Sequence, residues 1–199
     1  MMLVPLFRLL NLSVPLMLAN TVYSYFLPYM LISIPIYLIM RRELFNRKSI
    51  MGITLEGFKA RLPLAIAIGF VIGGMEGFML CPELAALGSK IDARLGMIIL
   101  TLILAGFAEE FIFRSALQTA LEKRLGSIRG LLVASMLFAI MHSSYGTWTE
   151  IMLGLGAGLA FGFLFQRTRS LPLVSLAHVI SSVLLLFLPP LFMPYIALL

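Results

Sequence analysis

The sequence predicts an all-α protein, a polytopic bundle of transmembrane helices that forms one membrane-embedded domain over residues 1–199. Three observations predict this class. Hydrophobic residues make up 61% of the chain and charged residues only 12%, against about 25% charged residues in soluble domains. The mean hydropathy is +1.04. The apolar residues also gather in long runs, and a chain of 199 residues holds about six spans of ~20 residues with short loops.

Six apolar runs are long or nearly long enough to be transmembrane helices, and they cover residues 9–40, 62–81, 95–121, 128–142, 151–166 and 171–188. The first run is too long for one upright helix and contains three prolines. We therefore expect either an interfacial N-terminal segment before a span near residues 20–40, or a kinked hairpin. The tail at residues 189–199 is too short to span alone. The runs within residues 9–81 thus precede a core at about residues 95–188.

Basic residues alternate in number from loop to loop. Six lie within residues 41–61, two within 90–94, three within 123–129, none within 145–150 and two within 167–169. By the positive-inside rule, the first, third and fifth of these loops are cytoplasmic. The net charge of +6 is then a signal of topology and not of nucleic-acid binding. We expect a multi-pass integral membrane protein, in the cell membrane if the source is prokaryotic.

Glycines at four-residue spacing occur in two of the predicted helices, as Gly69, Gly73 and Gly77 in one and as Gly154, Gly158 and Gly162 in another. In a bilayer, such ladders of small residues let two helix backbones approach closely. We interpret both ladders as helix-packing faces and not as ligand sites.

Three ionisable residues, Glu109, Glu110 and Arg114, lie close together in the third apolar run. Glu110 and Arg114 are four residues apart, so they share a helix face and are predicted to form an ion pair. Glu109 points about 100° away from Glu110 around the helix. This spacing leaves Glu109 as the working carboxylate, with Glu110 and Arg114 as its structural support. The alternative is that all three residues only hold helices together.

Both histidines of the chain also lie in apolar runs. His142 follows Phe138 by one helical turn, and His178 precedes Ser182 by one turn. Counted at about 1.5 Å per residue from the nearest cytoplasmic charge, Glu109, His142 and Ser182 lie about 20 Å deep, with His178 one turn nearer the cytoplasm. Ionisable groups at such depth are costly and mark functional sites, so we expect them to form one site.

These residues carry a resemblance to a known family. The segment from Glu109 to Arg114 reads EEFIFR and resembles an EExxxR motif, Phe138 to His142 reads FAIMH and resembles FxxxH, and His178 to Ser182 reads HVISS and resembles HxxxN. In this order, the three motifs are similar to those of the CAAX-protease and bacteriocin-processing (CPBP, or ABI) family of intramembrane endopeptidases. That family includes the type II CAAX prenyl proteases of the Ras-converting enzyme kind. One position departs from the family pattern, because Ser182 stands where asparagine is usual.

The resemblance implies that Glu109, His142 and His178 are catalytic, and that Glu110 and Arg114 support them. It also implies that the substrate is a prenylated CAAX-type protein or a peptide undergoing maturation. The residues fit amide hydrolysis by themselves: Glu109 is a candidate base, His142 can orient the same water, and His178 with Ser182 can hold the carbonyl. The active site would then open toward the cytoplasmic side.

A metal-dependent version uses the same residues. Glu109, His142 and His178 form a set of zinc ligands with an open position, although the HExxH motif is absent. The sequence alone leaves the need for zinc open. Two other functions also remain open: a proton-coupled transporter or channel in which Glu76 joins the relay, and a non-catalytic bacteriocin immunity protein.

Overall fold

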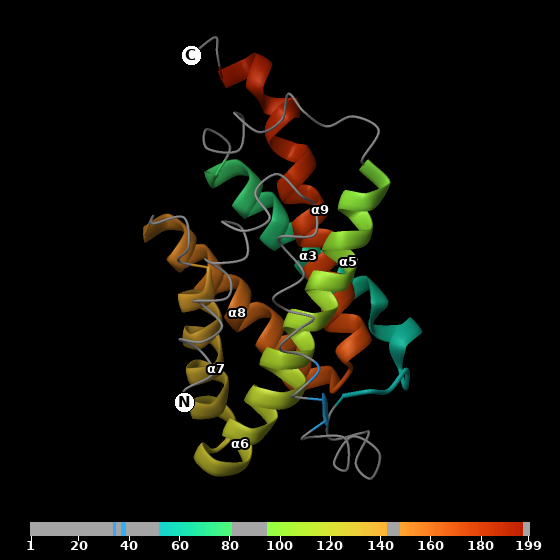
Figure 1. Ribbon diagram of the computed structural model, residues 1–199, viewed down its shortest axis with the longest axis vertical. Coiled ribbons are helices and arrows are strands. Elements are labelled where there is room, and N and C mark those ends of the chain that lie inside the picture. Colours follow the sequence, from blue (N-terminus) through green and yellow to red (C-terminus); the bar gives the residue numbers. More distant parts are fainter. Residues whose placement is uncertain (1–33, 35–36, 39–51, 81–94, 143–147, 197–199) are drawn as a thin grey trace.

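The computed structural model describes residues 34, 37–38, 52–80, 95–142 and 148–196 (Figure 1). Within these residues the regular structure is entirely helical, which confirms the predicted all-α class. In chain order, the helices are α3 (Phe58–Met79), α5 (Leu95–Glu110), the π-helix η3 (Phe111–Gln118), α6 (Thr119–Leu125), α7 (Ser127–Met141), α8 (Trp148–Thr168) and α9 (Leu171–Ile196). Most of the first apolar run, including the predicted N-terminal segment at residues 1–20, lies outside the described residues.

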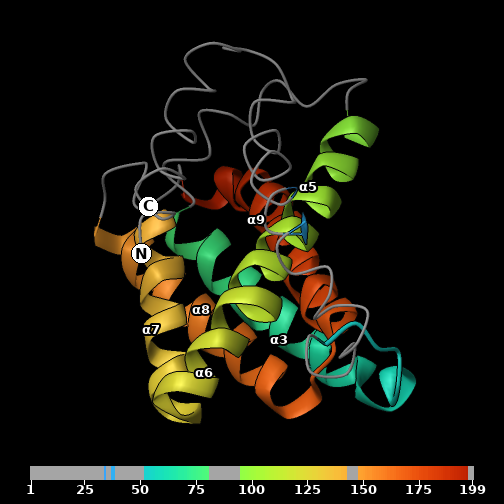
Figure 2. The ribbon, with the colours of Figure 1, turned by 60° about the horizontal axis from the view of Figure 1, so that its bottom comes forward.

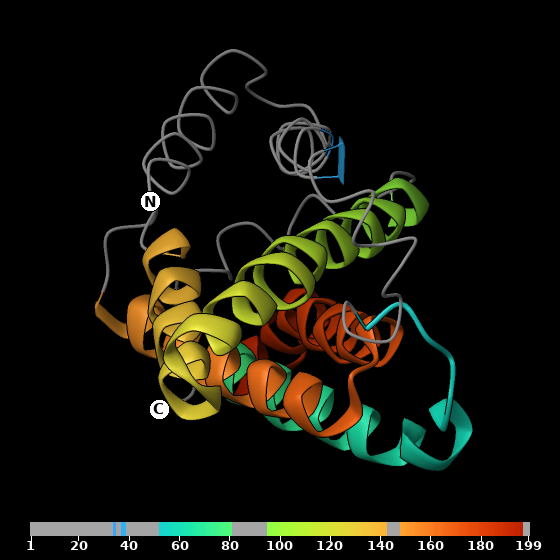
Figure 3. The same ribbon diagram turned by 90° about the horizontal axis from the view of Figure 1, so that it is seen from below.

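The helices pack in two main pairs, α3 with α9 and α7 with α8. Figure 2 shows α7 and α8 side by side, in gold and orange. The helical rod made of α5, η3 and α6 joins the two pairs, because α5 packs against α9 and α6 packs against α7. Figure 3 shows this rod, in green and yellow, crossing the bundle from end to end.

Large apolar side chains cover much of the outer surface of the bundle, and its interior holds small and polar residues together with a core of large apolar ones. The buried residues of α3 are Ala65 and three glycines, whereas Phe70, Val71 and Phe78 of the same helix are more than half exposed. Helices α3 and α8 are long and apolar enough to cross a membrane, and α7 and residues 171–185 are shorter apolar helices. A surface of large apolar side chains is suited to lipid, as expected of an integral membrane protein.

The five predicted runs from residue 62 onward agree with the helices to within a few residues, apart from two differences. Helix α9 continues to Ile196, eight residues beyond the predicted end at residue 188, so most of the tail is helical. The third run, residues 95–121, is one continuous helical stretch but changes its hydrogen-bonding pattern along the way. In its second half, between the α-helices α5 and α6, residues Phe111–Gln118 form a π-helix.

Buried side chains fix the π-helix at both ends. Arg114 pairs with Glu110, which lies just before η3. At the other end, Gln118 donates a hydrogen bond of 3.0 Å to the backbone carbonyl of Gly162 on α8, and the Thr119 hydroxyl donates one of 3.2 Å to the carbonyl of Arg114. π-helical turns are rare and occur frequently at functional sites. Here the turn directly follows the two acids.

The glycine ladder of α3 lies directly against the backbone of α9, as its spacing predicts. A Cβ atom added at Gly73 would lie 2.6 Å from the carbonyl oxygen of Ser181, and one at Gly69 would lie 2.6 Å from that of Ala177. The second ladder lies close to α7, though less tightly, since a Cβ at Gly158 would lie 3.1 Å from the carbonyl oxygen of Ser135. Both ladders are therefore packing faces: the first fixes α9 against α3, and the second fixes α7 against α8.

This close approach gives a testable prediction with a control in the next residue. Gly73→Ala should destabilise the protein by about 1–3 kcal/mol, because the added methyl group overlaps backbone atoms that cannot move aside. Gly74→Ala meets no atom within 4 Å and should be neutral or stabilising by up to about 1 kcal/mol. Thermal unfolding of both variants in one detergent measures the difference. Equal melting temperatures would contradict the tight α3–α9 contact.

Candidate active site

The carboxylate of Glu110 is the centre of the buried polar cluster. Its Oε2 lies 2.9 Å from Nε of Arg114, and both side chains are fully buried, which confirms the ion pair predicted from their spacing. Its Oε1 lies 2.7 Å from Nδ1 of His178. Because a carboxylate only accepts hydrogen bonds, the Nδ1–H of His178 is the donor. Glu110 therefore holds both an arginine from η3 and a histidine from α9.

Phe138 of α7 packs against the charged groups of this cluster. The guanidinium carbon of Arg114 lies 4.6 Å from the centroid of the Phe138 ring, which is a favourable cation–π distance. The same ring meets Phe113 edge to face, with 5.2 Å between centroids, and its centroid lies 6.0 Å from that of His178. The first residue of the FxxxH motif thus covers the ion pair and joins α7 to α9.

Glu109 faces the other nitrogen of His178. The Glu109 side chain is 9% exposed, and its Oε2 lies 3.8 Å from Nε2 of His178. This oxygen is buried and has no hydrogen-bond partner within the described part of the chain. With Nδ1–H directed to Glu110, a neutral His178 offers a lone pair at Nε2, so two acceptors face each other. One donor hydrogen-bonded to each of them, such as a water molecule, would satisfy both acceptors.

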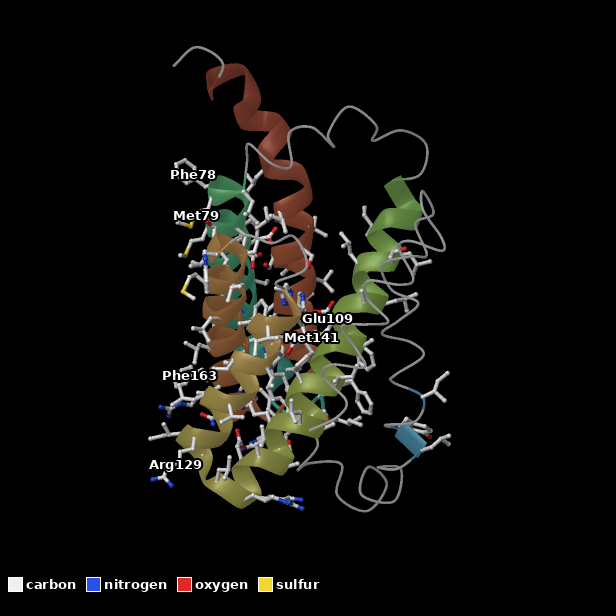
Figure 4. All side chains as sticks on the ribbon, turned by 60° about the vertical axis from the view of Figure 1, so that its left-hand side comes forward. Phe78, Met79, Glu109, Arg129, Met141 and Phe163 are labelled. Carbon is white, nitrogen blue, oxygen red and sulfur yellow. The ribbon has the colours of Figure 1, made fainter. Side chains whose placement is uncertain are left out.

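The depth estimate from sequence placed Glu109 and His178 one turn apart, whereas their side chains are neighbours. The difference arises because a glutamate and a histidine side chain each extend several ångströms along the helix axis. In Figure 4, the labelled Glu109 lies between the end of the bundle that carries Arg129 and the opposite end that carries Phe78 and Met79. The cluster is thus well inside the helical bundle.

His142 directly follows the last residue of α7, and one of its ring nitrogens is hydrogen-bonded. Its Nδ1 lies 3.0 Å from the carbonyl oxygen of Phe138, and because that oxygen only accepts, Nδ1–H is the donor. The His142 ring also packs on the Phe138 ring, with 4.4 Å between centroids. The hydrogen bond fixes the ring and leaves Nε2 available as an acceptor.

The serines at the end of the third motif differ in their contacts. Ser181 is buried and donates a hydrogen bond of 2.8 Å to Oε2 of Glu76 on α3. Ser182 is half-buried. Adjacent residues on a helix point about 100° apart, so only one of the two can face α3. The predicted role of Ser182 as a donor to the carbonyl remains a prediction.

Two residues of the cluster, Phe161 and Ser181, were not predicted from the motifs. Phe161 of α8 stacks on the His178 ring, with 5.1 Å between centroids and 19° between planes, and Ser181 binds Glu76. Phe161 adjoins Gly162 of the second glycine ladder, so its place on a packing face was a signal that could have found it. Ser181 could not be found in this way, because the motif assigns a role to the next position, Ser182, and none to Ser181.

A zinc site at Glu109, His142 and His178 would need their side chains to converge on one point. Among the described residues, no three imidazole, carboxylate or thiol groups converge closely enough to hold a metal. The arrangement of Glu109, His142 and His178 therefore does not form a zinc shell as it stands. Zinc remains a prediction from the sequence.

Comparison with known proteins agrees with the motif order. Residues 91–184 match the family model described as type II CAAX prenyl endopeptidase Rce1-like. The match covers just under half of the chain and includes all three motifs, so it confirms the resemblance predicted from them. No curated protein and no solved structure matches the chain.

Proposed function

We propose that this chain, whose residues 91–184 match the family model of Rce1-like type II CAAX prenyl endopeptidases, hydrolyses a peptide bond by means of a water molecule activated by Glu109. The family supports a CAAX-type intramembrane endopeptidase in general. The observation that carries the finer proposal is the buried Oε2 of Glu109, which has no hydrogen-bond partner among the described residues and faces Nε2 of His178 at 3.8 Å.

The reaction follows from these positions. Water donates one hydrogen to Oε2 of Glu109 and the other to Nε2 of His178, which holds its oxygen for attack. Glu109 removes a proton as the water oxygen bonds to the carbonyl carbon, and it then gives that proton to the leaving nitrogen as the carbon–nitrogen bond breaks. Glu110 keeps His178 in the required tautomer, in the way that a carboxylate orients a catalytic histidine elsewhere.

We assign two further residues to the same reaction. His142, with Nδ1–H held by the Phe138 carbonyl, presents Nε2 as an alternative acceptor for the water hydrogen that His178 otherwise receives. Ser182 is assigned as a donor to the developing oxyanion, because a neutral His178 has no hydrogen left to donate. The substrate we propose is a prenylated CAAX-type protein or a peptide undergoing maturation, cut near the cytoplasmic face of the bilayer.

The assignment of Ser182 is tested by two substitutions. Ser182→Ala should lower kcat by about 10², the usual effect of losing one oxyanion donor. Ser182→Asn should keep or raise kcat, because an amide supplies the donor that the family motif normally has at this position. Steady-state kinetics in detergent measures both variants. An alanine variant that behaves like the wild type would show that Ser182 only packs.

The class of function is tested by reconstituting the protein in liposomes and measuring peptide cleavage and proton flux on the same sample. An endopeptidase should cleave the peptide and leave a proton gradient intact. Proton flux without cleavage would contradict the proposal and favour a transporter, in which buried acids and histidines relay protons.

A further inference from the structure

Two aromatic rings contact the imidazole of His178 at different angles. Phe138 of α7 meets it nearly edge to face, with 72° between the ring planes and 6.0 Å between centroids. Phe161 of α8 lies almost parallel to it, with 19° between the planes and 5.1 Å between centroids. The Phe161 ring therefore covers one face of the imidazole, while Glu110 accepts the hydrogen bond of Nδ1–H at the ring edge.

The hydrogen bond to Glu110 does not by itself decide where Nε2 of His178 points. The torsion that turns a histidine ring has a broad energy minimum, so the ring can tilt while Nδ1–H still reaches its acceptor. The lone pair of Nε2 lies in the ring plane, and Nε2 faces Oε2 of Glu109 at 3.8 Å. A flat ring packed on the imidazole face opposes the tilt, because a tilted imidazole would overlap it.

Helix α8 is held in place on both sides of Phe161. Three residues before it, the close contact of Gly158 with the carbonyl of Ser135 fixes α8 against α7. Directly after it, the backbone carbonyl of Gly162 accepts the hydrogen bond of 3.0 Å from Gln118. Gln118 ends the π-helix that begins directly after the two acids. The helical rod that carries the acids thus also holds the segment of α8 that carries the stacking ring.

Burial limits what Phe161 can do in the reaction. Its side chain is 1% exposed, so it cannot touch a substrate bound from outside the bundle. A phenyl ring also has no group that donates, accepts or transfers a proton. Any contribution of Phe161 to the chemistry must therefore act through the imidazole on which it is stacked.

We propose that Phe161 is a positioning residue of the site, whose ring holds the plane of His178 so that Nε2 is aimed at the attacking water beside Glu109. This inference rests on the proposed peptidase function. It adds α8, which carries none of the three motifs, to the helices on which the chemistry depends.

The test removes the flat ring and compares the result with the same change one turn away. Phe161→Leu should lower kcat about 10- to 100-fold, since misplacing a reacting group by about 1 Å can cost 10² in rate. KM should change little, because Phe161 does not reach the substrate. Phe161→Tyr keeps the ring and should recover most of kcat.

The matched control is Phe165→Leu. Phe165 is also fully buried on α8, but its ring lies against the guanidinium of Arg169, 5.3 Å from the ring centroid. The control should be destabilised like Phe161→Leu and keep a kcat close to that of the wild type. Rates are compared at a temperature at which melts in the same detergent show both leucine variants to be folded.

Each outcome has a defined meaning. If Phe161→Leu cleaves as fast as Phe165→Leu while Glu109→Gln is inactive, the inference is wrong and the proposed function stands. The inference is equally wrong if Phe161→Tyr is as slow as Phe161→Leu, or if Phe161→Leu raises KM and leaves kcat unchanged.

A failure to fold is also decisive. If Phe161→Leu does not fold, Phe161→Met takes its place, because methionine fills a similar volume without a flat ring. If neither variant folds while Phe165→Leu does, Phe161 is required for the fold and the inference is overturned. If the folded wild type cleaves no peptide, the proposed function fails and the inference fails with it.

Discussion

Glu109→Gln is expected to lower kcat for peptide cleavage by about 10² to 10⁴, the range that general-base catalysis contributes. Glutamine has almost the same volume but cannot take a proton from water. The buried Oε2 of Glu109 has no hydrogen-bond partner among the described residues, so the substitution breaks no such bond there, and expression and melting temperature should stay close to those of the wild type.

The measurement compares initial rates of the two purified proteins on the same peptide, with Glu56→Gln as the control for an exposed acid. A Glu109→Gln rate within about tenfold of the wild type would rule out Glu109 as the base. A large loss of activity together with a much lower melting temperature would instead assign Glu109 to the packing of α5 against α9.

The second large effect concerns stability. Arg114→Ala should lower the free energy of unfolding by roughly 3–5 kcal/mol, because it leaves the carboxylate of Glu110 buried without its counter-charge. Both side chains of this ion pair are fully buried, and the change also removes the guanidinium that lies over the Phe138 ring. Unlike Glu109→Gln, this variant should lose stability and activity together.

Thermal melts in one detergent compare Arg114→Ala with Glu109→Gln and with Arg129→Ala, which removes an exposed arginine from α7. Arg114→Ala should melt well below both. The double variant Glu110→Ala/Arg114→Ala should recover part of the loss, because it no longer leaves a single buried charge unpaired. Equal melting points for Arg114→Ala and Glu109→Gln would contradict a buried ion pair at this position.

The helices and the Glu110–Arg114 pair could be predicted because both depend on local spacing. The length of an apolar run gives the span of a helix directly, and residues four apart on a helix meet wherever the helix is placed. Glycines at every fourth position likewise identify a packing face. These features need no knowledge of the partner helix.

The contact between Glu110 and His178 could not be predicted, because it joins residues 68 positions apart. Which face of α9 meets Glu110 depends on the rotation of α9, and the glycine ladder of α3 sets that rotation through backbone contacts. The same rotation decides that Ser181, and not its neighbour Ser182, reaches Glu76. The π-helix was also missed, because it depends on the buried partners of Arg114 and Gln118 and not on local propensity.

Mass spectrometry of one peptide tests the proposal that this chain is an endopeptidase that depends on Glu109. A peptide that ends in a CAAX sequence is prepared with and without its prenyl group and incubated with the wild type and with Glu109→Gln. The wild type should make a single cut that releases the three C-terminal residues, and Glu109→Gln should give no such product. Uncut peptide in every wild-type sample, or the same product from both proteins, would contradict it.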